Sequence, residues 1–228
     1  MTLACMCGRF AQINAERRAL EVLGGAMGDV CLEPSYNVAP SQDAHVIIQQ
    51  GEAQMAMMSW GLIPAWSKEK GRRPINARVE TVTEKPSFRD AFKVRRCLVP
   101  VDGFYEWTEA EGGKQPWWIR RADGGPMVLA GLWDAWQDPA GKVLRTFTIL
   151  TTGANPALRT LHHRMPLMLG VRRASAWLDG AASPQVLQAI LDYTPSDELS
   201  IHAVDRQVNS PRYNAPECLD PVEADPGS

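Results

Sequence analysis

The stretch CLVPVDGFYEW (residues 97–107) decides how the fold of this 228-residue chain is interpreted. Residues 97–101 and 103–108 are apolar, and the second segment is rich in aromatic residues, which predicts two central strands. One carboxylate, Glu106, stands among these aromatic side chains. Burial there would raise its pKa and suit it to general acid–base chemistry, whereas an edge position would leave it facing water or an arginine.

Further short apolar segments extend this pattern in both directions. They predict strands at 45–49, 54–59, 116–120, 127–133, 146–151 and 202–204, with glycine turns at 51, 112–113 and 124–125. Helices are expected at 14–23, 84–92, 154–160 and 183–193. Many short strands with few helices predict one compact α+β domain, mainly antiparallel β, with peripheral helices.

The composition indicates a folded globular protein. Hydrophobic residues make up 45% and charged residues 22% of the chain, which excludes a mainly disordered protein. No run approaches 18 uncharged apolar residues, so we expect no membrane partner. The five cysteines are odd in number and widely spread, which argues against a disulfide framework and for a cytoplasmic location.

The charge is distributed unevenly. The net charge of −2 does not by itself suggest a nucleic-acid binder, but residues 192–228 hold eight acidic and two basic residues. Eighteen of the 24 basic residues are arginine, whose fork suits phosphate oxygens. The densest basic run, 68–78, lies beside Trp60 and Trp66. This pattern fits either a groove for single-stranded nucleic acid or a solvated loop flanking core tryptophans.

Four places put reactive or polar groups inside apolar segments: Cys7, Asn76, Glu106 and the pair His162–His163. Each also has a purely structural interpretation, as a packed thiol, a turn cap, a surface carboxylate or a locally bonded histidine. Cysteine, histidine and glutamate together could also form a thiol-hydrolase set. The cysteine and histidine spacing does not fit zinc, and no glycine-rich nucleotide motif or serine-hydrolase elbow is present. We therefore expect neither a metal nor a cofactor.

Six segments in order make the chain resemble the SOS response-associated peptidase (SRAP) family. They are MCGRF (6–10), YNVAP (36–40), WGLIP (60–64) with Trp66, INARVE (75–80), CLVPVDGFYEW (97–107) and HHRMP (162–166). The resemblance assigns residues 6–215 to the SRAP domain. It leaves 1–5 as an N-terminal extension and 216–228 as an acidic tail that we expect to be disordered.

The resemblance implies a barrel-like α+β fold with a positively charged groove and a covalent link to abasic sites in single-stranded DNA. It implies Cys7 as the nucleophile, Asn76 and Glu106 as active-site polar groups and His162 as the general acid–base residue, with His163 the less expected actor. The implied DNA contacts are Arg9, Asn37, Pro40, Trp60, Trp66, Arg78 and Arg164. We expect a monomer that acts on single-stranded DNA without a cofactor or metal.

The implied chemistry needs a cysteine at the start of the mature chain. Its α-amine can condense with the aldehyde of an abasic site, and its thiol can then close a five-membered thiazolidine. An α-amine has a pKa of about 8, so a useful fraction is neutral at pH 7. Because six residues precede Cys7, either translation begins at Met6 or the segment 1–6 is removed by self-cleavage.

Two other functions stay open at this point. One is a thiol peptidase that uses Cys7, His162 and Glu106, and it would not need a free α-amine. The other is a non-enzymatic binder of single-stranded DNA, which would not need Cys7 at all.

Overall fold

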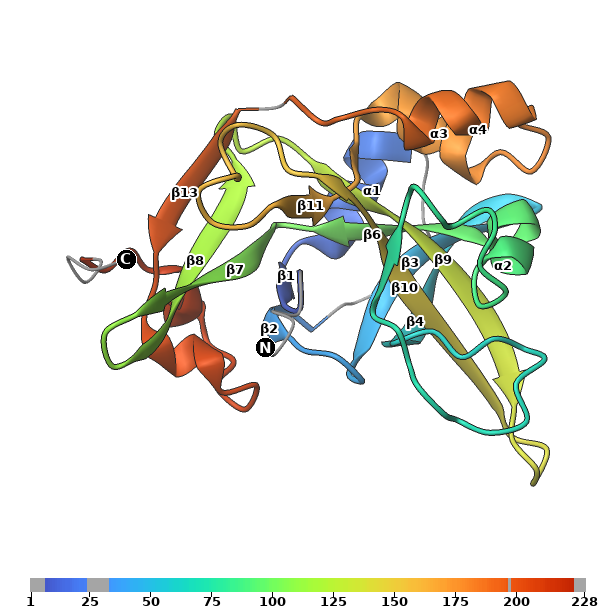
Figure 1. Cartoon of the computed structure of the whole chain (residues 1–228), viewed down its shortest axis with the longest axis horizontal. Coiled ribbons are helices and arrows are strands. Elements are labelled where there is room, and N and C mark those ends of the chain that lie inside the picture. Colours follow the sequence, from blue (N-terminus) through green and yellow to red (C-terminus); the bar gives the residue numbers. More distant parts are fainter. Residues whose placement is uncertain (1–6, 24–32, 197, 224–228) are drawn as a thin grey trace.

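The computed structural model describes residues 7–23, 33–196 and 198–223, and its strands form two sheets in that part of the chain. The five-stranded sheet contains β1 (Phe10–Gln12), β2 (Ser35–Val38), β7 (Gly103–Ala110), β8 (Gly113–Arg121) and β13 (Leu199–Ala203). The eight-stranded sheet contains β3 (Asp43–Gln50), β4 (Glu52–Trp60), β5 (Asn76–Arg78), β6 (Arg96–Val101), β9 (Met127–Gln137), β10 (Val143–Gly153), β11 (Arg164–Pro166) and β12 (Met168–Leu169). Figure 1 shows the two sheets side by side.

Most strand pairs are antiparallel. The five-stranded sheet has the order β13-β8-β7-β1-β2, and the larger sheet runs β11-β10-β4-β3-β6-β9-β12, with β5 on β10. Strand β9 also pairs with β10, which closes β10-β4-β3-β6-β9 into a five-stranded barrel. Strand β10 pairs in parallel with β4 and β5, which makes the larger sheet mixed. The expected α+β class, mainly antiparallel and barrel-like with few helices, is confirmed.

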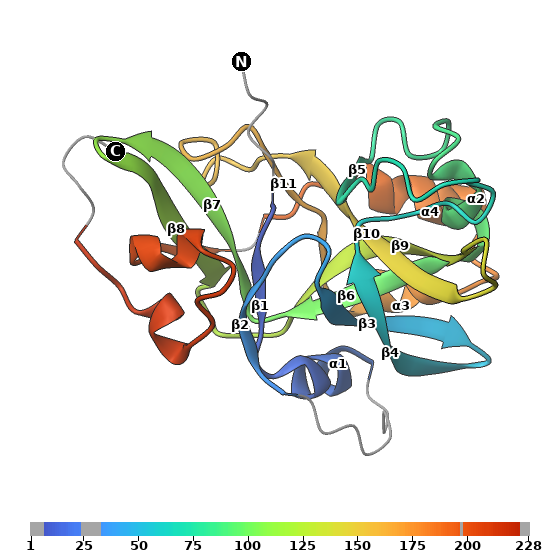
Figure 2. The same ribbon diagram turned by 90° about the horizontal axis from the view of Figure 1, so that it is seen from below.

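The helices are short and lie around the sheets (Figure 2). They are α1 (Ala15–Leu23), α2 (Arg89–Val94), α3 (Val171–Leu178), α4 (Pro184–Leu191) and the 3-10 helices η1 (Arg206–Asn209) and η2 (Pro216–Leu219). Within the described ranges, no helix has the length and apolar character needed to cross a membrane.

One hydrophobic core fills the inside of the barrel and extends to the smaller sheet. It contains Phe10, Val38 and Phe104 from the smaller sheet together with Val46 and Phe147 from the larger one. Side chains alternate between the faces of a strand, and a strand buried on both faces is apolar throughout. In β6 the side chains of Cys97, Val99 and Val101 enter this core, while Leu98 enters the next, which explains the continuous apolar run at 97–101.

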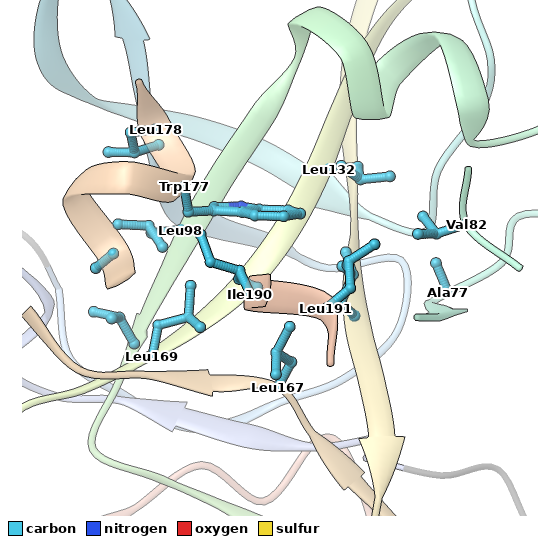
Figure 3. Close-up of a cluster of buried hydrophobic side chains, with 14 of the residues drawn as sticks. Ala77, Val82, Leu98, Leu132, Leu167, Leu169, Trp177, Leu178, Ile190 and Leu191 are labelled. Carbon is cyan, nitrogen blue, oxygen red and sulfur yellow. The ribbon is translucent and has the colours of Figure 1, made fainter. Parts of the chain in front are cut away.

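A second core fills the outer face of the eight-stranded sheet. Figure 3 shows the Trp177 indole of α3 surrounded by aliphatic side chains of the sheet and of α4. Trp177 is fully buried, and its Nε1 donates to the carbonyl oxygen of Cys97 at 3.0 Å. Arg96 anchors the same helix, because its guanidinium donates to the Trp177 and Asp179 carbonyls, each at 2.7 Å.

A third cluster covers the outer face of the five-stranded sheet and corrects the expected tail boundary. Cys218 of η2 is fully buried with Tyr105 and Trp118, while the neighbouring acidic residues face solvent. The expectation of disorder from residue 216 is therefore wrong for 216–223, because apolar residues among the acids give this segment a surface to bury. Residues 1–5, expected as an extension, and 224–228 lie outside the described residues.

Most predicted strands are confirmed, including the β3–β4 hairpin around Gly51, whose φ of +81° favours glycine. Two predicted helices are not. Residues 154–160 form turns, and the segment at 84–92 becomes helical only at Arg89. Each contains a proline near its start, Pro156 or Pro86, and the preceding residue disfavours helical geometry. The sequence reasoning missed α3 and the short strands β1, β2, β5, β11 and β12.

Candidate active site

The pairing of β1 with β7 brings the N-terminal segment to Glu106. Phe10 lies opposite Phe104 in an antiparallel register, and the Tyr105 amide donates to the Arg9 carbonyl at 3.0 Å. Continuing this register by two residues places Gly8 opposite Glu106. Gly103 at the start of β7 permits close packing, since a Cβ there would lie 2.5 Å from both the Ile119 carbonyl oxygen and the Trp118 ring.

The backbone nitrogen of Cys7 donates a hydrogen bond of 2.8 Å to Oε1 of Glu106. Cys7 is fully buried and has a φ of +37°, a region in which residues other than glycine are uncommon. Such a conformation costs energy and persists only where the surroundings enforce it. The fold therefore fixes this nitrogen against the carboxyl group.

Glu106 is poised to exchange a proton near neutral pH. Only 3% of the residue is exposed, and burial raises the pKa of its carboxyl group to about 7, against the opposing effect of the Cys7 N–H. At pH 7 the carboxylic acid and the carboxylate are then present in comparable amounts. The group can both accept a proton from the Cys7 nitrogen and return one to it.

Glu106 lies at a pocket of about 520 Å³ that also contains His162. The pocket is lined by Gly8, Arg9, Pro40, Glu106, Trp107, Glu109, Lys114, His162 and Asn209. Its walls come from β7 and β8, from the segments beside β1 and β2, from the loop before β11 and from η1, so distant parts of the sequence build it together.

His162 also lines this pocket. Its Nδ1 accepts a hydrogen bond of 3.1 Å from the Arg164 amide, so the neutral ring carries its proton on Nε2. Burial, followed by the positive charges of His163 and Arg164, lowers the pKa of His162. His163 is exposed and stacks on His162 with ring centroids 4.3 Å apart. The two histidines differ in position, because His162 lines the pocket and His163 does not.

Arg9 is held in the pocket wall by Asn37. Its Nη1 donates to Oδ1 of Asn37 at 2.7 Å and to the Val208 carbonyl at 3.0 Å, and its guanidinium lies over the Trp107 ring. Asn37 is 1% exposed, and its Nδ2 donates to the carbonyls of Val208, Ser210 and Tyr213. The expectation that Asn37 contacts DNA is therefore wrong, because its polar atoms are buried and occupied.

The two tryptophans expected at the DNA surface differ. Trp60 is fully buried, donates from Nε1 to the Ile75 carbonyl at 3.0 Å and packs on Phe10 at 4.8 Å between ring centroids. Its expected stacking on bases is wrong, because the ring has no exposed face. Trp66 is 60% exposed and can present its ring to a ligand.

Three further expected site residues lie along β10. Asn76 and Arg78 of β5 pair in register with Ile149 and Thr151, and Arg78 is exposed. Arg164 binds both carboxylate oxygens of Glu80 and also the Thr151 carbonyl, with 11% of its side chain exposed. Glu80 is therefore the partner of Arg164 in this structure, and a contact between Arg164 and DNA stays a prediction. Pro40, by contrast, is exposed at the pocket.

The sequence reasoning missed five lining residues: Gly8, Trp107, Glu109, Lys114 and Asn209. The hairpin of β7 and β8 offers a signal for Lys114, because that residue lies opposite Glu109 in the register. Its Nζ is 3.8 Å from Oε1 of Glu109. No local signal marks Asn209, which accepts from Nε1 of Trp107 at 2.6 Å and donates to the Lys114 carbonyl at 3.0 Å. Among the described residues, no three histidine, cysteine, aspartate or glutamate side chains gather as a metal site requires.

A family model described as SOS response associated peptidase (SRAP) matches residues 6–211. The chain belongs to the SRAP family. The matched range contains Cys7, Glu106 and His162, so the whole candidate site lies within the family domain. The resemblance inferred from the sequence motifs is confirmed.

The SRAP protein is similar to several named relatives. It is 40% identical to the abasic site processing protein YoaM of Bacillus subtilis, an alignment that covers 94% of this chain and 98% of that protein. It is 37% identical to YoqW of the same organism, covering 94% and 99%, and 35% identical to HMCES of Pongo abelii, covering 83% and 66%. Both carry the same description as abasic site processing proteins.

Solved structures share the fold of this SRAP protein. A protein from Bacteroides thetaiotaomicron superimposes with a TM-score of 0.74 at 25% identity, covering 96% of this chain and 99% of the other. A protein from Bordetella bronchiseptica gives a TM-score of 0.75 at 26% identity, covering 87% and 100%.

Proposed function

We propose that this SRAP protein processes abasic sites in single-stranded DNA by forming a covalent link through the α-amine and thiol of Cys7. The observation that carries the proposal is the 2.8 Å contact between the Cys7 nitrogen and Glu106, whose pKa is about 7. The description of its relatives as abasic site processing proteins supports the choice of substrate.

The reaction proceeds in two balanced steps. The neutral α-amine attacks the aldehyde carbon of the ring-opened sugar, and loss of one water gives a Schiff base. The thiol sulfur then adds to the same carbon while its proton passes to the nitrogen, which closes a thiazolidine. Because both nucleophiles belong to one residue, the second step is intramolecular and strongly favoured.

The neighbouring residues move the protons of this reaction. Glu106 accepts the proton that the amine loses on attack and returns it to the hydroxyl that leaves as water. His162 donates from Nε2 to the sugar oxygen as the ring opens, since its Nδ1 already binds the Arg164 amide. Asn76 hydrogen-bonds the sugar or the new linkage.

The DNA strand contacts the surface around the pocket. Arg9, Arg78 and Lys114 interact with phosphates, while Trp66 and Pro40 contact bases. Arg9 carries its charge in the pocket wall, and Arg78 and Trp66 are exposed. We propose that the protein acts as a monomer on DNA in the cytoplasm.

The test compares two purified proteins that differ at one end. One begins at Cys7, and the other carries a single alanine before Cys7. Each is incubated with an oligonucleotide containing one abasic site and then analysed by denaturing electrophoresis. The protein that begins at Cys7 should form a stable covalent species, and the alanine-extended protein and a Cys7→Ala variant should not. An unmodified oligonucleotide with the first protein would refute the proposal.

The same contact favours a second activity, cleavage of the bond before Cys7. In the uncleaved chain the nitrogen bound to Glu106 is the amide nitrogen of the Met6–Cys7 peptide bond. The Cys7 thiol would attack the Met6 carbonyl carbon, the C–N bond would break, and protonated Glu106 would give its proton to the leaving nitrogen. Water would then hydrolyse the resulting thioester.

Intact-mass analysis tests this thiol autopeptidase. A full chain expressed from a forced start at Met1 should lose residues 1–6, whereas Cys7→Ala and Glu106→Gln chains should keep them. If all three chains retain the segment, self-cleavage is excluded, and a start at Met6 becomes the source of the terminal cysteine.

A further inference from the structure

A second cavity, of about 540 Å³, lies at the other end of β8. It is lined by Ile13, Asn14, Arg18, Asp102, Trp118, Arg120, Arg121, Gly124, Gly125, His202, Leu219 and Pro221. None of these residues lines the candidate active-site pocket. Strand β8 connects the two, with Lys114 in the first pocket and Arg120 in the second, which separates them by about 20 Å at the usual rise of a strand.

Three arginines and one aspartate give this second cavity an excess of positive charge. Asp102 is already saturated: it accepts from the Ile13 and Asn14 amides at 2.7 and 2.9 Å and from Nε of Arg18 at 3.1 Å. Its side chain is only 8% exposed. Asp102 therefore fixes the cavity wall and offers no acceptor to a bound cation.

The arginines differ in what they can offer a ligand. Arg18 also donates to the Gly124 carbonyl at 3.0 Å, and Arg121 pairs with Asp123 at 2.6 Å. Arg120 is exposed and, in the described part of the chain, makes no ion pair. Its guanidinium is therefore the charge available to an incoming anion, beside two arginines whose positions are fixed.

Part of the lining of the second cavity is apolar and comes from the C-terminal segment. Leu219 and Pro221 lie there, held by a 2.9 Å contact between Nε2 of His202 and the Leu219 carbonyl and by the bridge between Val204 and Pro221. The second cavity thus combines a cationic side with an apolar side, and its volume lies within the roughly 300–1,000 Å³ typical of small-molecule sites.

We propose that the second cavity binds a nucleotide, with the phosphate on Arg120 and the base against Leu219 and Pro221. A guanidinium fork matches the spacing of phosphate oxygens, and a flat base can cover the apolar wall. The nucleotide comes either from solution or from a DNA strand, and both present the same phosphate group. This inference does not depend on the covalent chemistry at Cys7.

Isothermal titration calorimetry tests the second cavity with thymidine 5′-monophosphate, inorganic phosphate and unphosphorylated thymidine. We expect saturable binding of the monophosphate and at least tenfold weaker binding of thymidine. Arg120→Ala should weaken binding of the monophosphate at least tenfold. Lys142→Ala, which removes an exposed cation that lines neither pocket, should leave binding of the monophosphate unchanged. Arg120 is exposed, so thermal unfolding should show that its variant folds normally.

A short oligothymidylate without abasic sites distinguishes the two sources. If it binds more tightly than the monophosphate and loses that advantage in Arg120→Ala, the ligand is a DNA strand. If Arg120→Ala weakens binding of the monophosphate and leaves binding of the oligothymidylate unchanged, the ligand is a free nucleotide. Absence of saturable binding by the monophosphate and the oligonucleotide, or equal affinities for wild type and Arg120→Ala, would overturn the proposal. These probes carry no aldehyde, so their result is separate from any failure of crosslinking.

Discussion

The backbone nitrogen of Cys7 lies 2.8 Å from Oε1 of Glu106, although 99 positions separate the two residues in the chain. Antiparallel pairing of β1 with β7 produces this contact, and the burial of Glu106 raises the pKa of its carboxyl group to about 7. A nitrogen and a proton acceptor are therefore held together before any substrate arrives. Four predictions concern this site and its support, and one concerns the fold.

The rate of crosslinking should depend on the ionisation of Glu106. Since the carboxylate accepts the amine proton, the initial rate for the protein beginning at Cys7 should fall as pH drops below about 7. Glu106→Gln should slow the reaction on the order of 10²–10⁴-fold and remove this inflection. Single-turnover rates between pH 5 and 8.5 would check it, and an unchanged inflection in Glu106→Gln would contradict it.

Glu106 should also make the protein less stable at high pH. Its folded pKa of about 7 exceeds the ordinary value of 4.5, so the folded state holds the proton more tightly. Stability from this group is unaffected below pH 4.5, declines between 4.5 and 7, and stays reduced above 7. The folding stability of Glu106→Gln relative to wild type should therefore be higher at pH 8.5 than at pH 4 by up to about 3 kcal/mol. Urea unfolding at the two pH values measures the difference, and an equal effect at both would contradict the linkage.

The two tryptophans should respond in opposite ways to alanine substitution. Trp66→Ala should weaken binding of single-stranded DNA by about 1–3 kcal/mol and leave the melting temperature unchanged, because its ring is 60% exposed. Trp60→Ala should cost about 3–5 kcal/mol of folding stability, because it empties a core position. Fluorescence anisotropy and thermal unfolding of both variants separate the roles. If Trp66→Ala lowers the melting temperature and binds DNA normally, Trp66 contributes to folding stability and not to DNA binding.

Asn37→Ala should weaken the hydrogen bonds that hold the pocket wall, although Asn37 itself makes no contact with DNA. The change removes donors to three carbonyls and the acceptor for Arg9, which leaves buried polar groups unsatisfied at a cost of about 1–3 kcal/mol. We expect a lower crosslinking rate together with faster hydrogen exchange at 208–213. Ser196→Ala provides a control on an exposed loop. Normal exchange at 208–213 would show that Asn37 does not hold this segment.

Arg96 should be required for the fold and not for the chemistry. The residue is 6% exposed, and its guanidinium donates to the carbonyls of Phe92, Lys93, Trp177 and Asp179. Arg96→Met should cost about 3–5 kcal/mol because four acceptors lose their donor. Arg96→Lys should recover little, since an ammonium lacks the fork that reaches both α2 and α3. Chemical unfolding beside the exposed control Arg172→Ala checks this, and equal stability of Arg96→Met and wild type would refute it.

The strands that the sequence predicted are those whose pattern is local. The run at 97–101 and the aromatic segment after it form β6 and β7. They could be predicted because a strand that is buried on both faces needs apolar residues at consecutive positions. The short strands β1, β5 and β11 have three residues each, too few to show a period. Their positions are set by long-range pairing, which leaves no local mark.

The candidate site was foreseeable in its chemistry and not in its geometry. Motifs identified Cys7, Glu106 and His162, and the structure brings the first two into contact and the last two into one pocket. The motifs did not distinguish a surface role from a buried one, so the buried residues Trp60 and Asn37 were assigned to DNA. Burial of Trp60 and Asn37 and the ion pair of Arg164 depend on partners elsewhere in the chain.

The pocket wall joins the two ends of the domain, since Arg9 binds the Val208 carbonyl across 199 positions. During synthesis, a nascent chain that has exposed Cys7 still lacks Asn37's three carbonyl partners and the Asn209 that orients Trp107. At roughly 5–20 residues per second, the ribosome needs about 10–40 s to supply them. Cys7 therefore exists for that interval without its finished pocket, and the reactivity proposed for it would begin only when translation of the domain is almost complete.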